Sequence, residues 1–247
     1  METIKQEITE YWARRSGQFS SLRTQELHSE KRVQWTEELL RYLPRGKFLD
    51  ILDVGCGSGF FSVILASMGH HVTGIDLTPE MIKEARKTAD SLGLSIDFRV
   101  MDAENPDFPD GSFDVILSRN LTWTLPHLKE TYIRWKQLLK PEGILLNFDG
   151  DYCRENNNEA QLPANHAHRA IDASLNAAYE HLKSELAPAQ KPRPAWDRDI
   201  LAAAGFRNIR IDRDLSRRLY QKADAFYNPT PMFTICAHNQ TEVTEHV

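Results

Sequence analysis

Residues 52–59, with the sequence LDVGCGSG, constrain the fold of this chain more than any other segment. The apolar residues 48–54 lead directly into the glycines, and a second apolar run, residues 60–68, follows them. This order predicts a β-strand, a tight turn and an α-helix, because glycine adopts backbone conformations that other residues disfavour. The helix would direct free backbone N–H groups to the end of the strand, which predicts a ligand site at the turn.

The alternation of strand and helix continues along the chain. Strands are predicted at residues 71–76, 95–101, 113–118 and 143–149, and apolar residues at helical spacing lie between several of them. Thr78, Pro79 and Glu80 mark a helix start, since they suit the cap, the first turn and the positive helix end. Five strands separated by helices predict a mostly parallel, doubly wound α/β sheet. Strand-like residues 209–212 and 232–238 follow later.

The composition excludes several classes of protein. The chain has 247 residues, of which 41% are hydrophobic and 26% charged, which are ordinary values for a globular protein. Lys and Arg number 30 against 35 Asp and Glu, so the chain lacks the basic excess of a nucleic-acid-binding protein. No apolar stretch is long enough to span a membrane, the first residues contain no signal sequence, and the three cysteines are far apart. We therefore expect a cytoplasmic protein without a membrane partner.

Asp76 makes the glycine turn a more specific signal. It ends the second predicted strand, where a carboxylate can accept hydrogen bonds from both hydroxyls of a ribose. Together the turn and Asp76 indicate a ligand that contains adenosine. The dinucleotide fingerprint would need a glycine where this chain has Phe60, and no Gly-Lys-Ser/Thr follows the turn as it would in a P-loop. These differences disfavour NAD and FAD and exclude a P-loop.

Four motifs in order give the chain a family resemblance. LDVGCGSGFFS resembles motif I of the class I S-adenosylmethionine (SAM)-dependent methyltransferases, and GIDLTPEMIKEAR resembles the motif that follows it. MDAENPDFPDGSFDVILSRNLTW is similar to the segment that contacts adenine and forms the fourth strand. LKPEGILL resembles the motif usually written LKPGG, with Glu142 in place of its first glycine. The match covers about residues 48–149, and the N-terminal YWARR resembles the lead-in helix of many small-molecule members.

The resemblance implies a Rossmann-like sheet of seven strands in the order 3-2-1-4-5-7-6, with the last strand antiparallel. We expect a single methyltransferase domain over residues 1–247. Within it, residues 1–45 are predicted to form an N-terminal helical cap and residues 46–150 the SAM-binding core. Residues 151–195 are predicted to form a lid over the substrate, since ligands of open α/β sheets bind beyond the carboxyl ends of the strands. Residues 196–247 would complete the sheet.

The resemblance also implies which residues bind the cofactor. Asp76 would hold the ribose hydroxyls, Asp102 the adenine amino group, and Arg15 the carboxylate of SAM. Asp53 would lie near its ammonium group, and Asn120 beside the sulfonium. The full set of implied cofactor contacts is Tyr11, Arg15, Asp53, Gly55, Cys56, Gly57, Asp76, Leu77, Met81, Asp102, Ala103, Arg119 and Asn120.

Candidates for the methyl acceptor follow the fourth and fifth strands. Trp123 could form an aromatic wall beside the methyl group, and Tyr152 could bind the acceptor. His127 and Asp149 are candidate catalytic residues, His127 as a base because imidazole titrates near neutral pH. His166 and His168, with Cys153 upstream, fit no standard zinc spacing, so no metal is predicted.

We therefore predict a SAM-dependent methyltransferase that transfers a methyl group to a nitrogen, oxygen or sulfur atom of a small molecule and releases S-adenosylhomocysteine (SAH). No nucleic-acid partner is expected, and the chain could be a monomer or a homodimer. Three alternatives stay open. They are an RNA or protein methyltransferase, a SAM-binding sensor or partner subunit without catalysis, and a nicotinamide-dependent oxidoreductase, which Phe60 disfavours.

Overall fold

The computed structural model describes residues 2–154, 163, 172–186 and 191–240. Its elements are α1 (Glu2–Leu27), α2 (Glu30–Leu40), β1 (Asp50–Val54), α3 (Phe60–Ser67), β2 (His71–Asp76), α4 (Pro79–Ser91), β3 (Asp97–Val100), β4 (Phe113–Arg119), the 3-10 turn η1 (Thr122–Thr124), α5 (Leu128–Leu138), β5 (Leu139–Gly150), α6 (Ala173–Glu185), α7 (Ala195–Ala203), β6 (Arg207–Asp212), α8 (Leu215–Leu219) and β7 (Met232–His238).

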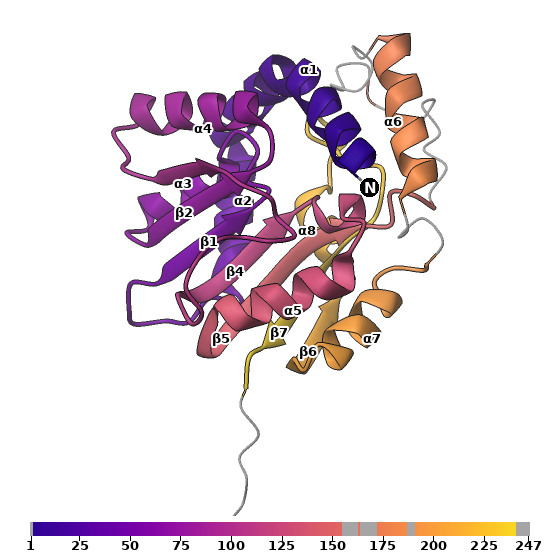
Figure 1. The fold of residues 1–247 in the computed structure, drawn as a ribbon. Coiled ribbons are helices and arrows are strands. Elements are labelled where there is room, and N and C mark those ends of the chain that lie inside the picture. The colour runs from indigo at the N-terminus through magenta and orange to yellow at the C-terminus, as the bar shows by residue number, and fades with distance from the viewer. Residues whose placement is uncertain (1, 155–162, 164–171, 187–190, 241–247) are drawn as a thin grey trace, which may run out of the picture.

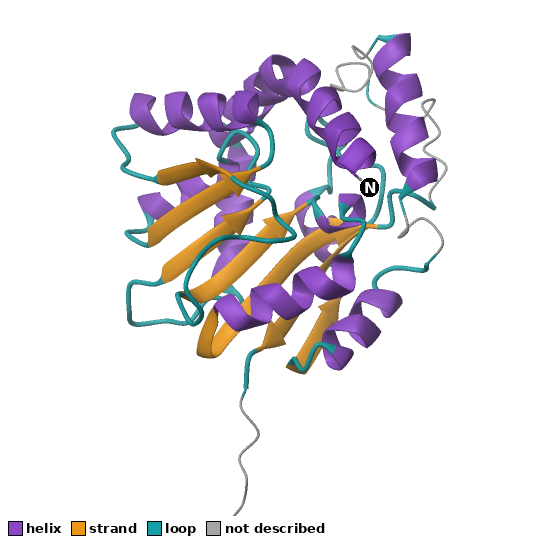
Figure 2. Ribbon diagram, in the orientation of Figure 1, coloured by secondary structure: helices purple, strands orange, loops and turns teal. Residues whose placement is uncertain are grey.

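The strands form one seven-stranded sheet in the order β3-β2-β1-β4-β5-β7-β6 (Figure 2). Strands β1 to β5 pair in parallel, whereas β7 is antiparallel to both β5 and β6. The predicted order and the antiparallel last strand are therefore confirmed. From β1 the chain continues outward through β2 and β3 and then returns to the other side of β1 as β4. In an open α/β sheet, the place where the strand order reverses in this way is where a ligand binds.

Helices cover both faces of the sheet, with α5 and α7 on the near face in Figure 1 and α2 and α3 on the far face. Successive strand residues point to opposite faces, so Ile51 and Leu117 belong to the core under α2, α3 and α8. Leu52 and Ile116 belong to the second core, under α5 and α7. Because both faces are buried, the central strands are continuous apolar runs rather than alternating ones.

The fifth strand begins earlier than the sequence predicts. The sequence predicts a strand at residues 143–149, but β5 starts at Leu139. Leu139 pairs with Phe113 and Ile144 with Val115, so residues 140–143 form an irregularity within the ladder. Glu142 adopts a left-handed conformation with φ of 63°, the conformation that the glycine of the usual LKPGG motif would favour.

Two helices, α1 and α6, lie side by side beyond the carboxyl ends of the strands (Figure 1). Tyr11 of α1 stacks on Tyr179 of α6 with ring centroids 5.9 Å apart, and Arg14 donates a hydrogen bond to Ser174 at 2.8 Å. Much of the predicted lid, including His166 and His168, lies outside the described residues. No helix within the described ranges is long and apolar enough to cross a membrane.

Candidate functional site

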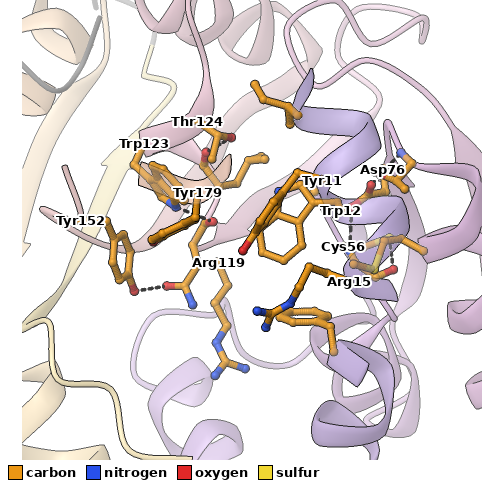
Figure 3. Close-up of a pocket in the computed structure, with 18 of the residues that line it drawn as sticks. Tyr11, Trp12, Arg15, Cys56, Asp76, Arg119, Trp123, Thr124, Tyr152 and Tyr179 are labelled. Carbon is orange, nitrogen blue, oxygen red and sulfur yellow. Dashed lines mark hydrogen bonds between the residues drawn. The ribbon is translucent and has the colours of Figure 1, made fainter. Parts of the chain in front are cut away.

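A cavity of about 600 Å³ lies at the carboxyl ends of the parallel strands. Its floor consists of the turn after β1, the ends of β2 and β4, the segment after β3, and η1, while α1, α6 and residues 225–229 contribute its other walls. All thirteen residues predicted to bind the cofactor line this cavity, and so do both residues predicted to bind the acceptor. Figure 3 shows Asp76 and Cys56 at one end and Trp123, Tyr152 and Tyr179 at the other.

The carboxylate of Asp76 is oriented by two backbone amides. Gly57 N–H donates to Oδ2 and Thr78 N–H donates to Oδ1, each at 2.9 Å. Burial raises the pKa of Asp76, although these two amides oppose the shift. The carboxylate is therefore fixed at the edge of the cavity, and each oxygen keeps a further lone pair for a ligand hydroxyl.

Asp53, at the centre of the floor, is 2% exposed and accepts a hydrogen bond from Ser62 Oγ at 2.6 Å. Burial raises the pKa of Asp53 to about 7. Beside it, the glycine turn has no room for side chains, because a Cβ at Gly55 would lie 2.7 Å from Leu121. The backbone at Gly55, with φ of 65°, is also in the left-handed region that favours glycine.

At the end of the cavity near β3, Lys5 of α1 reaches across to two acids. Its Nζ lies 2.6 Å from Asp102 and 2.5 Å from Glu104. The second oxygen of Asp102 accepts the backbone N–H of Glu104 at 2.9 Å. The first turns of α1 are thereby tied to the segment that follows β3, and both oxygens of Asp102 have protein partners.

An aromatic wall stands at the opposite end. The ring of Trp123 lies 5.6 Å from that of Tyr152 and 5.5 Å from that of Tyr179. Tyr152 donates its hydroxyl to Asn120 Oδ1 at 2.8 Å and accepts from Asn228 at 2.7 Å. Trp123 Nε1 donates to the carbonyl of Asn120 at 3.1 Å, so three hydrogen bonds hold the wall in place.

The two candidate catalytic residues, His127 and Asp149, do not line the cavity. His127 precedes α5, where its backbone N–H and its Nδ1 both contact Glu104, at 2.6 and 3.2 Å. Asp149 is fully buried and forms an ion pair of 3.0 Å with Arg193. It also accepts the hydroxyl of Thr122 at 2.5 Å. Asp149 thus supports η1 from below rather than facing a ligand.

Comparison with known proteins agrees with this geometry. Residues 52–147 match the family described as "Methyltransferase domain". Residues 52–147 therefore form a methyltransferase domain. The chain is 42% identical over 126 residues to phosphoethanolamine N-methyltransferase 1 of Arabidopsis thaliana, a match that covers 49% of this chain and 25% of that protein. It is 41% identical over 102 residues to the ubiquinone biosynthesis O-methyltransferase of Actinobacillus pleuropneumoniae, which covers 38% and 43% of the two chains.

Solved structures share the fold of the methyltransferase domain. A SAM-dependent methyltransferase from Aquifex aeolicus matches with a TM-score of 0.58 and 20% identity, over 87% of this chain and 96% of that one. Phosphoethanolamine N-methyltransferase 2 of Haemonchus contortus, solved in complex with SAM, matches with a TM-score of 0.59 and 18% identity, over 84% and 53%. This chain spans less than half of the length of the curated relatives named above.

The cavity residues fit SAM. Arg15 is 5% exposed, yet its Nε and Nη1 are buried without a hydrogen-bond partner among the described residues. Buried guanidinium nitrogens without partners are costly, and the carboxylate of the methionine moiety would satisfy both of them. The fixed carboxylate of Asp76 suits the ribose diol, and Asp53 suits the ammonium group. The cavity therefore has complementary groups for the carboxylate, the ribose and the ammonium group of the cofactor, whereas the carboxylate of Asp102 already pairs with Lys5.

The structure adds cavity residues that the sequence did not single out. Tyr179 comes from α6, Asn228 from the segment before β7, and Arg23 from α1. Tyr220, which follows α8, is another lining residue. Glu26 is fully buried and pairs with the guanidiniums of Arg23 and Arg119, which line the cavity. Polar and aromatic residues on helices are common, so their types alone carry no signal. Only their convergence on one cavity distinguishes them.

Proposed function

We propose that this protein transfers the methyl group of SAM to a small-molecule acceptor and releases SAH. The observation that carries the proposal is the single cavity, which holds groups complementary to SAM at one end and an aromatic wall at the other. Arg119 lies between these two ends in Figure 3. A cofactor and an acceptor can therefore meet within one space.

SAM supplies the activated methyl group, and the residues of the chain align the reactants and exclude water. Asp76 and Arg15 would fix the ribose and the carboxylate, which flank the sulfonium, so that the sulfonium faces the acceptor end. The carbonyl of Asn120, held in place by Trp123, would lie beside the sulfonium. The helices α1 and α6 would keep water away from the reacting atoms, which strengthens each electrostatic contact inside the cavity.

We further propose that neither His127 nor Asp149 acts as the base. Neither lines the cavity, and no histidine is among the described residues that do. A nucleophile with a free lone pair, such as a neutral amine, needs no base in the transfer step. The relatives are named for both nitrogen and oxygen acceptors, so amines are the acceptors to test first and phenols second.

The test begins with binding. Calorimetry of the purified protein with SAM, SAH and NADH should give binding of the first two alone, whereas binding of NADH alone would refute the proposal. Turnover is then measured as SAH formed from SAM with phosphoethanolamine or a catechol as acceptor. If SAM binds but no acceptor in a broad small-molecule panel is methylated, a non-catalytic SAM-binding protein becomes the better explanation. Binding of mixed RNA at low salt would favour the RNA alternative.

A further inference from the structure

Two guanidiniums in the cavity share one buried carboxylate. Glu26 is fully buried and accepts hydrogen bonds from Arg23 and, at 2.9 Å, from Arg119. Its other contact is Trp35, whose Nε1 donates at 3.2 Å. Although burial opposes it, the two guanidiniums lower the pKa of Glu26, so the carboxylate is ionised at neutral pH. Both arginines line the cavity.

The charges of this cluster do not balance. Arg23 and Arg119 contribute two positive charges against the single negative charge of Glu26. The Nε atoms of both arginines are also buried without a hydrogen-bond partner among the described residues. Burial lowers the pKa of Arg23, and the charge of Arg119 lowers it further, while Glu26 opposes both. A buried cationic excess with unused donors is the condition under which a protein binds an anion.

SAM does not supply enough negative charge. It carries one carboxylate, together with an ammonium and a sulfonium, so it adds one net positive charge to the cavity. Arg15 is a third guanidinium with unpartnered nitrogens and is itself suited to that carboxylate. Among the acids that line the cavity, Asp102 and Glu104 pair with Lys5, and Asp53, which interacts electrostatically with Arg119, is the acid proposed to face the ammonium group of SAM. With the cofactor bound, the positive charge around Arg23 and Arg119 is therefore still in excess.

Building on the proposed methyl transfer, we propose that Arg23 and Arg119 form an anion subsite that binds a carboxylate or phosphate group of the methyl acceptor. The acceptor is thus a small molecule with an anionic group at one end and its nucleophile at the other. The rings of Trp35 and Phe60 lie 4.3 and 4.7 Å from the Arg119 guanidinium carbon, and they hold its orientation. The aromatic wall at Tyr152 then receives the uncharged part of the acceptor.

The experiment uses the SAH complex of the full chain, with inorganic phosphate and acetate as probes for the two anion chemistries. Calorimetry should show that the wild-type complex binds at least one probe and that the Arg23→Gln variant binds it about tenfold more weakly. Arg23→Lys should restore part of this loss because it keeps the charge. Arg217→Gln is the matched control, since Arg217 is 85% exposed and lies outside the cavity.

A second variant changes the affinity in the opposite direction. Glu26→Gln removes the carboxylate that competes with the probe for Arg23 and Arg119, and it should therefore strengthen probe binding. If the three residues only maintain the structure of the cavity, both Arg23→Gln and Glu26→Gln would weaken probe binding. Circular dichroism verifies that each variant folds. If Glu26→Gln does not fold, Arg23→Gln alone tests the inference, because the Arg23→Gln variant keeps the Glu26–Arg119 pair. Unchanged probe affinity in a folded Arg23→Gln variant overturns the inference, and so does the absence of probe binding to the wild-type complex.

The cofactor arm separates this inference from the proposed function. SAH should bind Arg23→Gln with unchanged affinity. If SAH binding to Arg23→Gln weakens as much as probe binding, the pair holds the carboxylate of the cofactor and the inference is wrong. If SAH does not bind the wild-type protein at all, the proposed function fails instead.

Discussion

Asp53 is predicted to make the apo protein less stable as the pH rises. Burial raises its pKa from the ordinary value of 3.8 to about 7. Between these two values the folded chain holds a proton that the unfolded chain has released, so stability falls with increasing pH across this window. Each pKa unit corresponds to about 1.4 kcal/mol, which gives a cost of about 4 kcal/mol for ionised Asp53 at pH 8.

The Asp53→Asn variant isolates this cost. Its Oδ1 can still accept the hydroxyl of Ser62, but its amide hydrogens gain no acceptor, which costs about 1–3 kcal/mol. We expect the variant to be about as stable as wild type at pH 5, where wild type has already lost about 1.7 kcal/mol, and more stable by about 2 kcal/mol at pH 8. Urea unfolding at pH 5, 6, 7 and 8 measures both curves. Asp90→Asn, an exposed position on α4, is the matched control and should run parallel to wild type.

The affinity for SAH should increase with pH, whereas the stability of the apo protein decreases. If Asp53 meets the ammonium of the ligand, SAH affinity increases between pH 6 and 8 as Asp53 ionises, and this increase is lost in Asp53→Asn. At pH 8 the variant would then bind SAH more weakly than wild type, although it unfolds at a higher urea concentration than wild type. Parallel unfolding curves for variant and wild type from pH 5 to 8 would show that the burial of Asp53 has been misjudged. A retained pH dependence of SAH binding would remove Asp53 from the cofactor site.

The remaining predictions concern four positions. Asp76→Asn should weaken SAH binding by about 2 kcal/mol, because two hydroxyls lose a charged acceptor, and calorimetry that finds an unchanged Kd would mean the ribose lies elsewhere. Gly55→Ala should destabilise the fold by about 1–2 kcal/mol through its left-handed backbone alone, with the contact at Leu121 adding to this. Gly17→Ala in helix α1, where nothing lies within 4 Å of the added Cβ, should instead raise the Tm. His127→Gln should leave the pH profile of kcat unchanged, and loss of the decrease in kcat at low pH would restore His127 as a candidate base.

The fold could be predicted because its signals are local. The glycine turn fixes the end of β1, Asp76 marks the end of β2, and apolar runs mark the other central strands. The beginning of β5 could not be predicted from the same signals. Lys140 and Glu142 are charged, and the segment becomes part of a strand because Leu139 pairs with Phe113 and Ile144 with Val115. Tertiary pairing overrides local propensity there.

The residues of the candidate site likewise comprise some that could be predicted from the sequence and some that could not. Residues that follow a parallel strand could be predicted, because the ends of such strands meet at one edge of the sheet. Asp149 shows the limit of that argument. It lies in β5 near its end, yet its side chain is buried against Arg193, which is 44 residues away in the sequence. The pairing of Glu26 with Arg119 spans 93 residues, and no periodicity or motif links two such positions.

The division between predictable and unpredictable residues also bears on the acceptor. Asp53, Asp76 and Asp102 lie within the segment that matches the methyltransferase family, whereas Arg23 and Tyr179 lie outside it. The matched segment therefore contains the acids at the proposed cofactor end of the cavity, while Arg23 and Tyr179 come from outside the match. Helix α1 reaches both ends of the cavity, since Lys5 and Arg23 are 18 residues apart in one helix, about 27 Å along its axis. Because the match to the curated relatives spans only part of their chains, the identity of their acceptors says less about this protein than the charge and shape of its own cavity.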